Sequence, residues 1–204
     1  MRALRARYRA MVGNDRTPLL ICANHLTMVD SVLIAWALAG PWWYLRHYRT
    51  LPWNTPERSN FASNPLQAAL TYVLKCIPIQ RGGRRAEVAE TLQRFAGAIA
   101  SGEVGLIFPE GGRSRSGRVE MENAAWGVGR VVKSIPRCRV LCVYLRGDAQ
   151  DNYSRLPARD DTLRISMDFI EPKSEHEGLR GSLEISRQIV AKLADMEREY
   201  FDAR

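Results

Sequence analysis

Hydrophobic positions along the chain follow two patterns. Short unbroken apolar runs, at 18–23 and 104–108, are typical of strands that are buried on both faces of a sheet. Helical spacing marks 84–100, where the residues Val88, Leu92 and Phe95 share one face. By the same criteria and by turn residues, we expect helices over 29–39, 64–74, 123–134 and the C-terminus, strands over 42–45, 77–79, 139–145 and 162–170, and a loop over 50–64.

Strands that alternate with helices predict an α/β fold, with a mostly parallel or mixed central sheet flanked by helices. The chain has 204 residues, which fits one domain, so we expect 1–204 to form a single unit. The longest uncharged and mostly apolar run, 32–45, is shorter than the roughly 18 residues that a spanning helix needs. Any membrane contact is therefore expected to be peripheral.

The first segment, 1–13, predicts a basic amphipathic helix. Leu4, Tyr8 and Met11 share one face, arginines occupy another, and no acidic residue is present. This pattern fits an ordinary surface helix and a helix that lies on an anionic bilayer equally well. A mitochondrial transit peptide is a weaker third interpretation, because the first strand follows too closely for a removable leader.

The net charge of +8 favours an anionic partner, either a phosphate-bearing small molecule, a membrane surface or nucleic acid. The four cysteines show no CxxC spacing, which favours free thiols in a reducing compartment. We therefore expect a cytoplasmic protein, peripheral on the cytoplasmic face of the membrane.

The first candidate for chemistry is the segment NHLTMVD, residues 24–30, between a predicted buried strand and a predicted helix. Open α/β sheets bind ligands at such strand ends. His25 could accept a proton near neutral pH, and the Asp30 carboxylate could orient its ring. Residues five apart on a regular helix point about 140° away from each other, so His25 must precede the helix. The alternative is a packing histidine with Asp30 as a helix cap.

Two further segments combine glycine and arginine after predicted strands. FPEGGRSRSG, at 108–117, offers backbone that can approach a ligand closely and guanidinium groups that match phosphate oxygens. CIPIQRGG, at 76–83, places Arg81 after another strand. Both segments predict an anion-binding edge, and either arginine group alone could instead be a solvated loop.

In order and spacing, these three segments resemble the conserved blocks of the glycerolipid acyltransferases related to bacterial lysophosphatidic acid acyltransferase, enzymes of phospholipid synthesis. NHLTMVD resembles the NHxxxxD block, FPEGGRS the FPEGTRS block, and CIPIQR an apolar block that ends in arginine. Together they span about half of the chain, 24–114.

The resemblance implies that His25 is the general base on an acceptor hydroxyl, that Asp30 orients it, and that no acyl-enzyme forms. The donor would be acyl-CoA or acyl-carrier protein, with no further cofactor, and the acceptor a lysophospholipid or a glycerol-phosphate-like molecule. The same resemblance assigns substrate binding to Arg81, Glu110, Gly111, Arg113 and Ser114; for Glu110, substrate contact and loop organisation both stay open.

The chain departs from the family pattern at two positions. Gly112 replaces the usual threonine, and Cys142 stands near the place of a proline in the fourth block. Many relatives also carry apolar N-terminal helices, where this chain has only the basic segment 1–13.

Two other functions compete with acyl transfer. A hydrolase of acyl thioesters could use the same histidine to activate water, with Ser114, Ser116 or a cysteine as nucleophile, although no GxSxG elbow is present. Nucleic-acid binding would explain the arginine-rich segments 81–85 and 113–118. These segments lack interleaved aromatic residues, however, and this function leaves His25 unexplained, so we expect no nucleic-acid partner.

The three scattered histidines predict no metal site. The tryptophans at 36–53 could line an acyl groove, lie at a bilayer interface or pack in the core.

Overall fold

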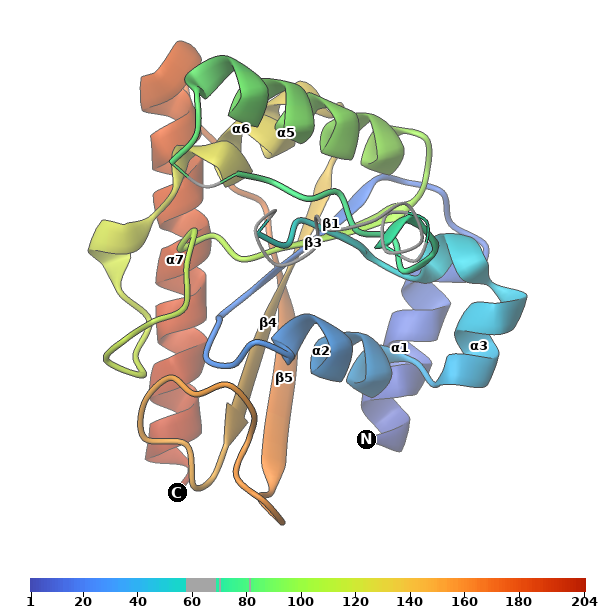
Figure 1. Ribbon diagram of the computed structural model, residues 1–204, viewed down its shortest axis with the longest axis vertical. Helices are drawn as coiled ribbons and strands as arrows, with labels where there is room; N and C mark the ends of the chain where they lie inside the picture. Colours follow the sequence, from blue (N-terminus) through green and yellow to red (C-terminus); the bar gives the residue numbers. More distant parts are fainter. Residues whose placement is uncertain (58–68, 70, 81) are drawn as a thin grey trace.

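A mixed sheet of five strands forms the centre of the computed structural model, which describes residues 1–57, 69, 71–80 and 82–204 (Figure 1). The strand order is β2-β3-β1-β4-β5. The first four strands are parallel and β5 is antiparallel to β4. This confirms the predicted α/β fold with a mixed central sheet. The strands are β1 (Leu19–Ala23), β2 (Trp53–Asn54), β3 (Val104–Ile107), β4 (Arg139–Gly147) and β5 (Leu163–Ile170).

Helices cover both faces of the sheet. One face packs against α1 (Arg2–Val12), α2 (Asp30–Leu38) and α3 (Pro41–Arg46). The other packs against α5 (Arg85–Ala100), α6 (Trp126–Ser134) and α7 (Gly178–Asp202). Short 3-10 turns, η1 (Tyr48–Thr50) and η3 (Met121–Asn123), join these elements. No helix in the described part of the chain is both long and apolar enough to cross a bilayer.

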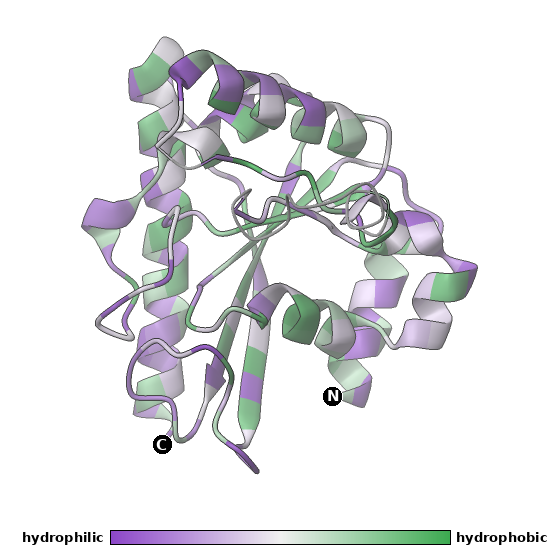
Figure 2. Cartoon of the chain, viewed as in Figure 1, coloured by the Kyte–Doolittle hydropathy of each residue, from purple (hydrophilic) through white to green (hydrophobic). Residues whose placement is uncertain are grey.

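The continuous apolar run of β1 explains why both faces of the sheet are covered. Alternate side chains of a strand point to opposite faces. Leu20 and Cys22 therefore join the core under α5, α6 and α7, whereas Leu19 and Ile21 join the core under α1 and α2. Figure 2 shows hydrophobic colour on the central strands and alternating colours along α7.

Most predicted elements are present, with ends shifted by a few residues, but the strand predicted over 42–45 is wrong. These residues lie in α3, which begins at Pro41 after the extended Gly40. Proline at a first helical position is favoured there, and this preference outweighs the strand tendency of Trp42 and Trp43.

The region that follows differs in part from the prediction. Segment 76–79 runs beside 54–57 through two isolated parallel bridges instead of forming a strand, as expected for a segment that contains Pro78, which has no N–H to donate. The loop predicted over 50–64 contains β2. Its residues beyond Glu57, and most of the helix predicted over 64–74, lie outside the described residues.

The carboxyl ends of β1 and β3 meet at one edge of the sheet. The Asn24 side chain holds β1 to β4 there: its amide donates to the Leu145 carbonyl at 2.9 Å, and its oxygen accepts the Leu145 N–H at 2.8 Å. Asn24 thus continues the sheet pairing by one residue and fixes where the chain leaves the sheet. His25 is the next residue.

Close contact between α6 and α7 depends on Gly129. A Cβ at this position would overlap the Ser182 carbonyl of α7, whereas a Cβ at the exposed Gly97 of α5 would meet nothing. We expect Gly129→Ala to lower the free energy of unfolding by at least about 2 kcal/mol, because backbone must move. Gly97→Ala should raise it by about 0.5–1 kcal/mol through helix propensity. Urea unfolding measures both, and equal stabilities would contradict this packing.

Candidate active site

The turn between β1 and α2 is built around the Asp30 carboxylate. This group is buried and accepts the N–H of Leu26 at 2.6 Å, the N–H of Thr27 at 2.8 Å and the Thr27 hydroxyl at 2.5 Å. It also lies 3.0 Å from Nδ1 of His25. Asp30 therefore does not cap the helix that it begins: its partners all precede it in the chain. Its carboxylate closes the turn and brings His25, five residues earlier, alongside.

The hydrogen bond to Asp30 determines which nitrogen of His25 is available. A carboxylate with three other donors favours a proton on Nδ1, which leaves the lone pair of Nε2 free. Within the described residues, no hydrogen bond to Nε2 is found. With 9% of its surface exposed, His25 is sheltered but reachable. Such a pair can act chemically as a general base with an orienting carboxylate.

The loop after β3 holds the other side of His25. The Phe108 ring stacks on the imidazole, with ring centres 3.9 Å apart and an angle of 11° between the planes. The N–H of Ser114 donates to the His25 carbonyl at 2.9 Å. These two contacts bring the NHLTMVD and FPEGGRS segments together, as their places after parallel strands predict.

Arg113 and Gly111 shape this loop at the edge of the sheet. Gly111 has a positive φ of 70°, which a side chain rarely adopts, and a Cβ would lie 3.2 Å from Ala125. The half-buried Arg113 donates one hydrogen bond to the Ser154 carbonyl at 3.4 Å and lies over the Tyr153 ring at 5.4 Å. Its other guanidinium donors make no such contact with described residues and can bind an anion. A Cβ at Gly112 would meet nothing, so the family's threonine would fit there.

Ser114 and Glu110 make contacts that organise the loop. The buried Ser114 hydroxyl donates to the Arg118 carbonyl at 2.5 Å. Glu110, also buried, accepts the N–H of Glu120 at 3.3 Å, and its other oxygen has no partner among the described residues. Burial raises the pKa of Glu110 to about 7, and the charges of Glu120 and Glu197 act in the same direction. These contacts favour loop organisation for Glu110; substrate binding by either residue stays a prediction.

Two buried charged residues that sequence analysis did not select support the same loop. Arg146, at the end of β4, donates to the carbonyl oxygens of Gly117 and Gln150. Glu197 of α7 accepts the Tyr144 hydroxyl at 3.1 Å and the Val119 N–H at 3.2 Å, and it lies 3.7 Å from Arg146. A lone arginine after the apolar run 140–145 was a usable sequence signal for Arg146. Glu197 carried none, because it lies on a long helix with many charges.

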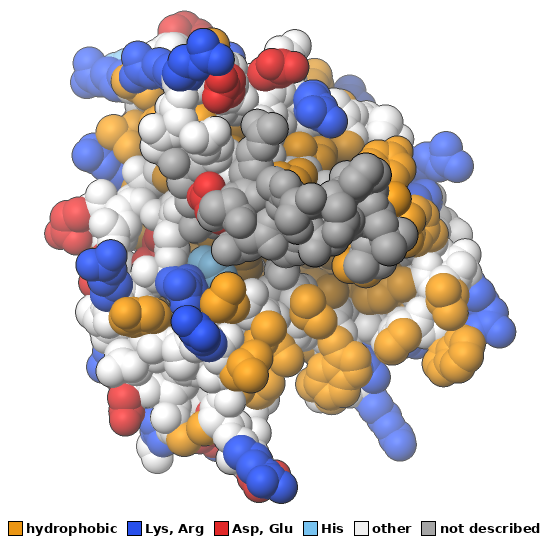
Figure 3. Space-filling view, in the orientation of Figure 1, with side chains coloured by type: hydrophobic (Ala, Val, Ile, Leu, Met, Phe, Trp, Pro, Cys, Tyr) orange, Lys and Arg blue, Asp and Glu red, His pale blue; other side chains and the backbone are white. Residues whose placement is uncertain are grey.

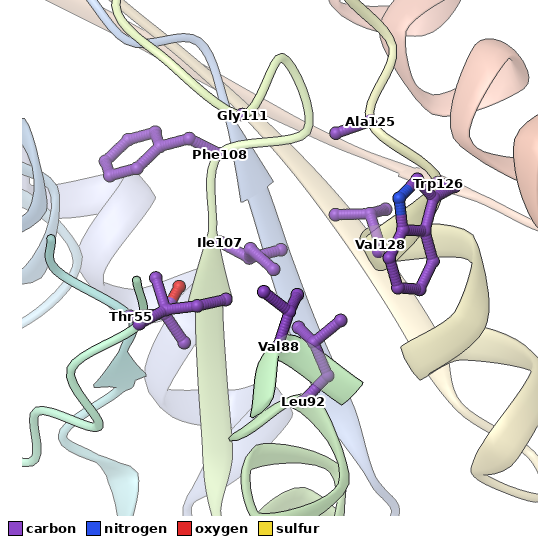
Figure 4. A pocket seen from close by; sticks show the side chains of 11 residues that line it. Thr55, Val88, Leu92, Ile107, Phe108, Gly111, Ala125, Trp126 and Val128 are labelled. Atoms are coloured by element: carbon purple, nitrogen blue, oxygen red, sulfur yellow. The ribbon is translucent and has the colours of Figure 1, made fainter. Parts of the chain in front are cut away.

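An apolar pocket of about 210 Å³ lies at the same end of the sheet, and Phe108, whose ring stacks on His25, is among its lining residues. Side chains of α5, β3 and α6 surround it, and the Phe108 ring points away from Val88, Leu92 and Trp126 (Figure 4). Among the lining residues that the structure describes, only Thr55 carries a hydroxyl. The lining residues are Thr55, Ile79, Val88, Leu92, Ile107, Phe108, Gly111, Ala125, Trp126, Gly127 and Val128.

Other sequence candidates are placed as follows. Arg81 lies outside the described residues; its neighbour Ile79 lines the apolar pocket. Cys22 and Cys142 are fully buried in the core, and burial raises the pKa of the Cys142 thiol to about 12, so neither fits a nucleophile. Among the residues that the structure describes, no cluster of histidine, cysteine and acidic side chains could hold a metal ion.

Comparison with known proteins shows the family of this chain. A family model described as Acyltransferase matches residues 6–168, most of the chain, and the match spans the turn, the loop and the pocket. The chain belongs to the acyltransferase family. None of the curated proteins compared with it gives a match. Acyl transfer is thus the general activity of this family, and His25, Asp30 and the loop lie within the matched region.

The buried Glu110 carboxyl should make stability depend on pH. Its pKa rises on folding from 4.5 to about 7, so the unfolded chain loses this proton first and stability falls as pH rises through that window. Between about pH 5 and about pH 8, the free energy of unfolding of Glu110→Gln should increase by about 1–3 kcal/mol relative to that of wild type. Urea unfolding at both pH values measures this, with the exposed Glu122→Gln as control. A pH-independent difference would contradict the prediction.

Proposed function

We propose that this acyltransferase moves a fatty acyl group from acyl-CoA or acyl-carrier protein to the hydroxyl of a lysophospholipid or glycerol-phosphate-like acceptor. The observation that carries the proposal is the His25 and Asp30 pair at 3.0 Å, packed against a loop that presents an arginine and lines an apolar pocket. No cofactor beyond the thioester donor is needed. The setting is the cytoplasmic side of a membrane.

In this mechanism, Nε2 of His25 takes the proton of the acceptor hydroxyl as its oxygen attacks the thioester carbonyl. The C–S bond then breaks, and the proton goes to the leaving thiolate. Asp30 stabilises the imidazolium that exists between these two proton transfers. No acyl-enzyme is required, and the contacts of Ser114 support this, because its hydroxyl is held by the Arg118 carbonyl.

The acceptor phosphate fits the free donors of Arg113. A guanidinium beside the glycine-rich backbone of 111–112 matches phosphate oxygens by charge and geometry. Arg81, predicted at the same edge, would add a second guanidinium. A phosphate held here places the acceptor hydroxyl beside the loop that contacts His25.

The acyl chain fits the apolar pocket. Its volume of about 210 Å³ is below the range of pockets that enclose whole drug-sized ligands, so it suits a section of a chain and not a head group. Because Phe108 lines the pocket and stacks on His25, an acyl chain seated there can place its carbonyl end near the base.

Activity assays test the proposal directly. Purified wild type should convert acyl-CoA and lysophosphatidic acid in detergent to free CoA and diacyl lipid in equal amounts. His25→Ala should lower kcat at least about a hundredfold, because the general base is lost. His176→Ala is the matched control and should leave kcat unchanged. Release of CoA without acylated lipid would identify a hydrolase, and full activity in His25→Ala would disprove the mechanism.

The width of the apolar pocket should set the preferred donor. Val88→Phe adds bulk to the α5 wall, so kcat/KM for a long acyl-CoA should fall about tenfold or more relative to a short one. Ala86→Phe adds bulk on the same helix at an exposed position outside the lining, and should leave that ratio unchanged. An equal ratio of kcat/KM for long and short acyl-CoA in all three proteins would mean that the acyl chain binds elsewhere.

A further inference from the structure

The outer side of α2 is apolar, which is unusual for a helix at a protein surface. Ile34, Ala37 and Leu38 pack against the sheet, as expected. On the opposite side, Val32 is 67% exposed and Trp36 is 50% exposed. Only Asp30 and Ser31 of the nine residues are polar, and both lie in the first turn. A helix that is apolar all round is normally buried or in contact with lipid.

Neighbouring segments extend this apolar side into one surface, which we name the α2–α3 surface. Trp42 and Leu45 of α3 are 74% and 72% exposed. At the other end, Met28 lies in the turn between His25 and Asp30, and its N–H donates to the Arg155 carbonyl, which brings in the exposed Leu156. Figure 3 shows hydrophobic side chains gathered over this region. The surface consists of Met28, Val32, Trp36, Trp42, Leu45 and Leu156.

Arginines occur on and next to the segments that form the α2–α3 surface. Arg5 of α1 lies over the Trp36 ring at 5.1 Å and donates to the Trp36 carbonyl at 2.9 Å. Arg2, Arg46 and Arg155 are exposed. The chain has no acidic residue in 1–14 or in 31–56. Exposed tryptophan with flanking arginine and no acid is the composition of a segment that lies in the interface of an anionic bilayer.

We propose that the α2–α3 surface docks on the surface of an anionic phospholipid bilayer. Aromatic and aliphatic side chains enter the acyl boundary, and the arginines contact lipid phosphates. This proposal rests on the proposed function in one respect: Met28 lies three residues after His25, so the docked protein opens its site at the bilayer, where a lysophospholipid acceptor resides. In this proposal, the membrane contact lies mainly on α2 and α3, and α1 contributes arginines.

Co-sedimentation with vesicles tests the docking. Wild type should bind phosphatidylcholine vesicles that contain phosphatidylglycerol, and bind vesicles of phosphatidylcholine alone more weakly. Val32→Glu/Leu45→Glu should lower binding to the anionic vesicles about tenfold or more. The matched control, Met121→Glu/Leu179→Glu, changes exposed apolar residues on the α7 side and should bind as wild type does. Equal binding by the first double variant and wild type would overturn the proposal.

Two further measurements separate this proposal from its alternatives. If wild type is a dimer in sedimentation velocity and Val32→Glu/Leu45→Glu is a monomer, the surface joins two copies of the chain and the proposal falls. Turnover of a short-chain acyl-CoA and a dispersed short-chain acceptor, without vesicles, should be equal in wild type and this variant, which shows that the variant is folded. Vesicle binding without any acyl transfer would refute the proposed function alone, and transfer without vesicle binding would refute the docking alone.

Discussion

The site depends on one buried carboxylate. Asp30 gathers two backbone N–H groups, one hydroxyl and one imidazole nitrogen, which a turn of five residues could not otherwise bring to a single point. A buried charge without such partners would cost several kcal/mol, so the turn can form only in the conformation that satisfies it. The same contacts that make the turn stable therefore set the position and the tautomer of His25. Structural and chemical requirements are met by one group.

Rigid neighbours then transmit this arrangement to the rest of the site. The Asn24 side chain holds the start of the turn to β4. The N–H of Ser114, in the loop after β3, donates to the His25 carbonyl. That loop is held in turn by Arg146 from β4 and Glu197 from α7. Arg146 and Glu197 bind the backbone of the loop, and Arg113 keeps guanidinium donors that can bind a ligand. Under the proposed function, this end of the sheet holds two groups with opposite properties, an anionic head group and an apolar chain.

Sequence alone predicted the fold class and the pairing of the main segments, because buried strands and amphipathic helices leave a local pattern. It also required His25 to precede the helix, since residues five apart cannot meet on one. It failed at α3, where Pro41 was a better guide than the aromatic residues after it. It could not find Glu197 or the pocket, because both depend on packing between segments far apart in the chain. Nor could it show that Trp53 is buried while Trp36 and Trp42 are exposed, since one residue type serves both roles.

Phe108 gives the site a property that neither of its two contacts has alone. One face of the ring supports the imidazole, and the residue also lines the apolar pocket. A displacement of Phe108 would therefore disturb both the pocket and the packing of the imidazole. Under the proposed function, an acyl chain in the pocket contacts the residue that packs on the histidine, whereas a donor that leaves the pocket empty does not. The enzyme would then sense the length of its donor through the orientation of its base, so that selectivity would appear in kcat as well as in binding.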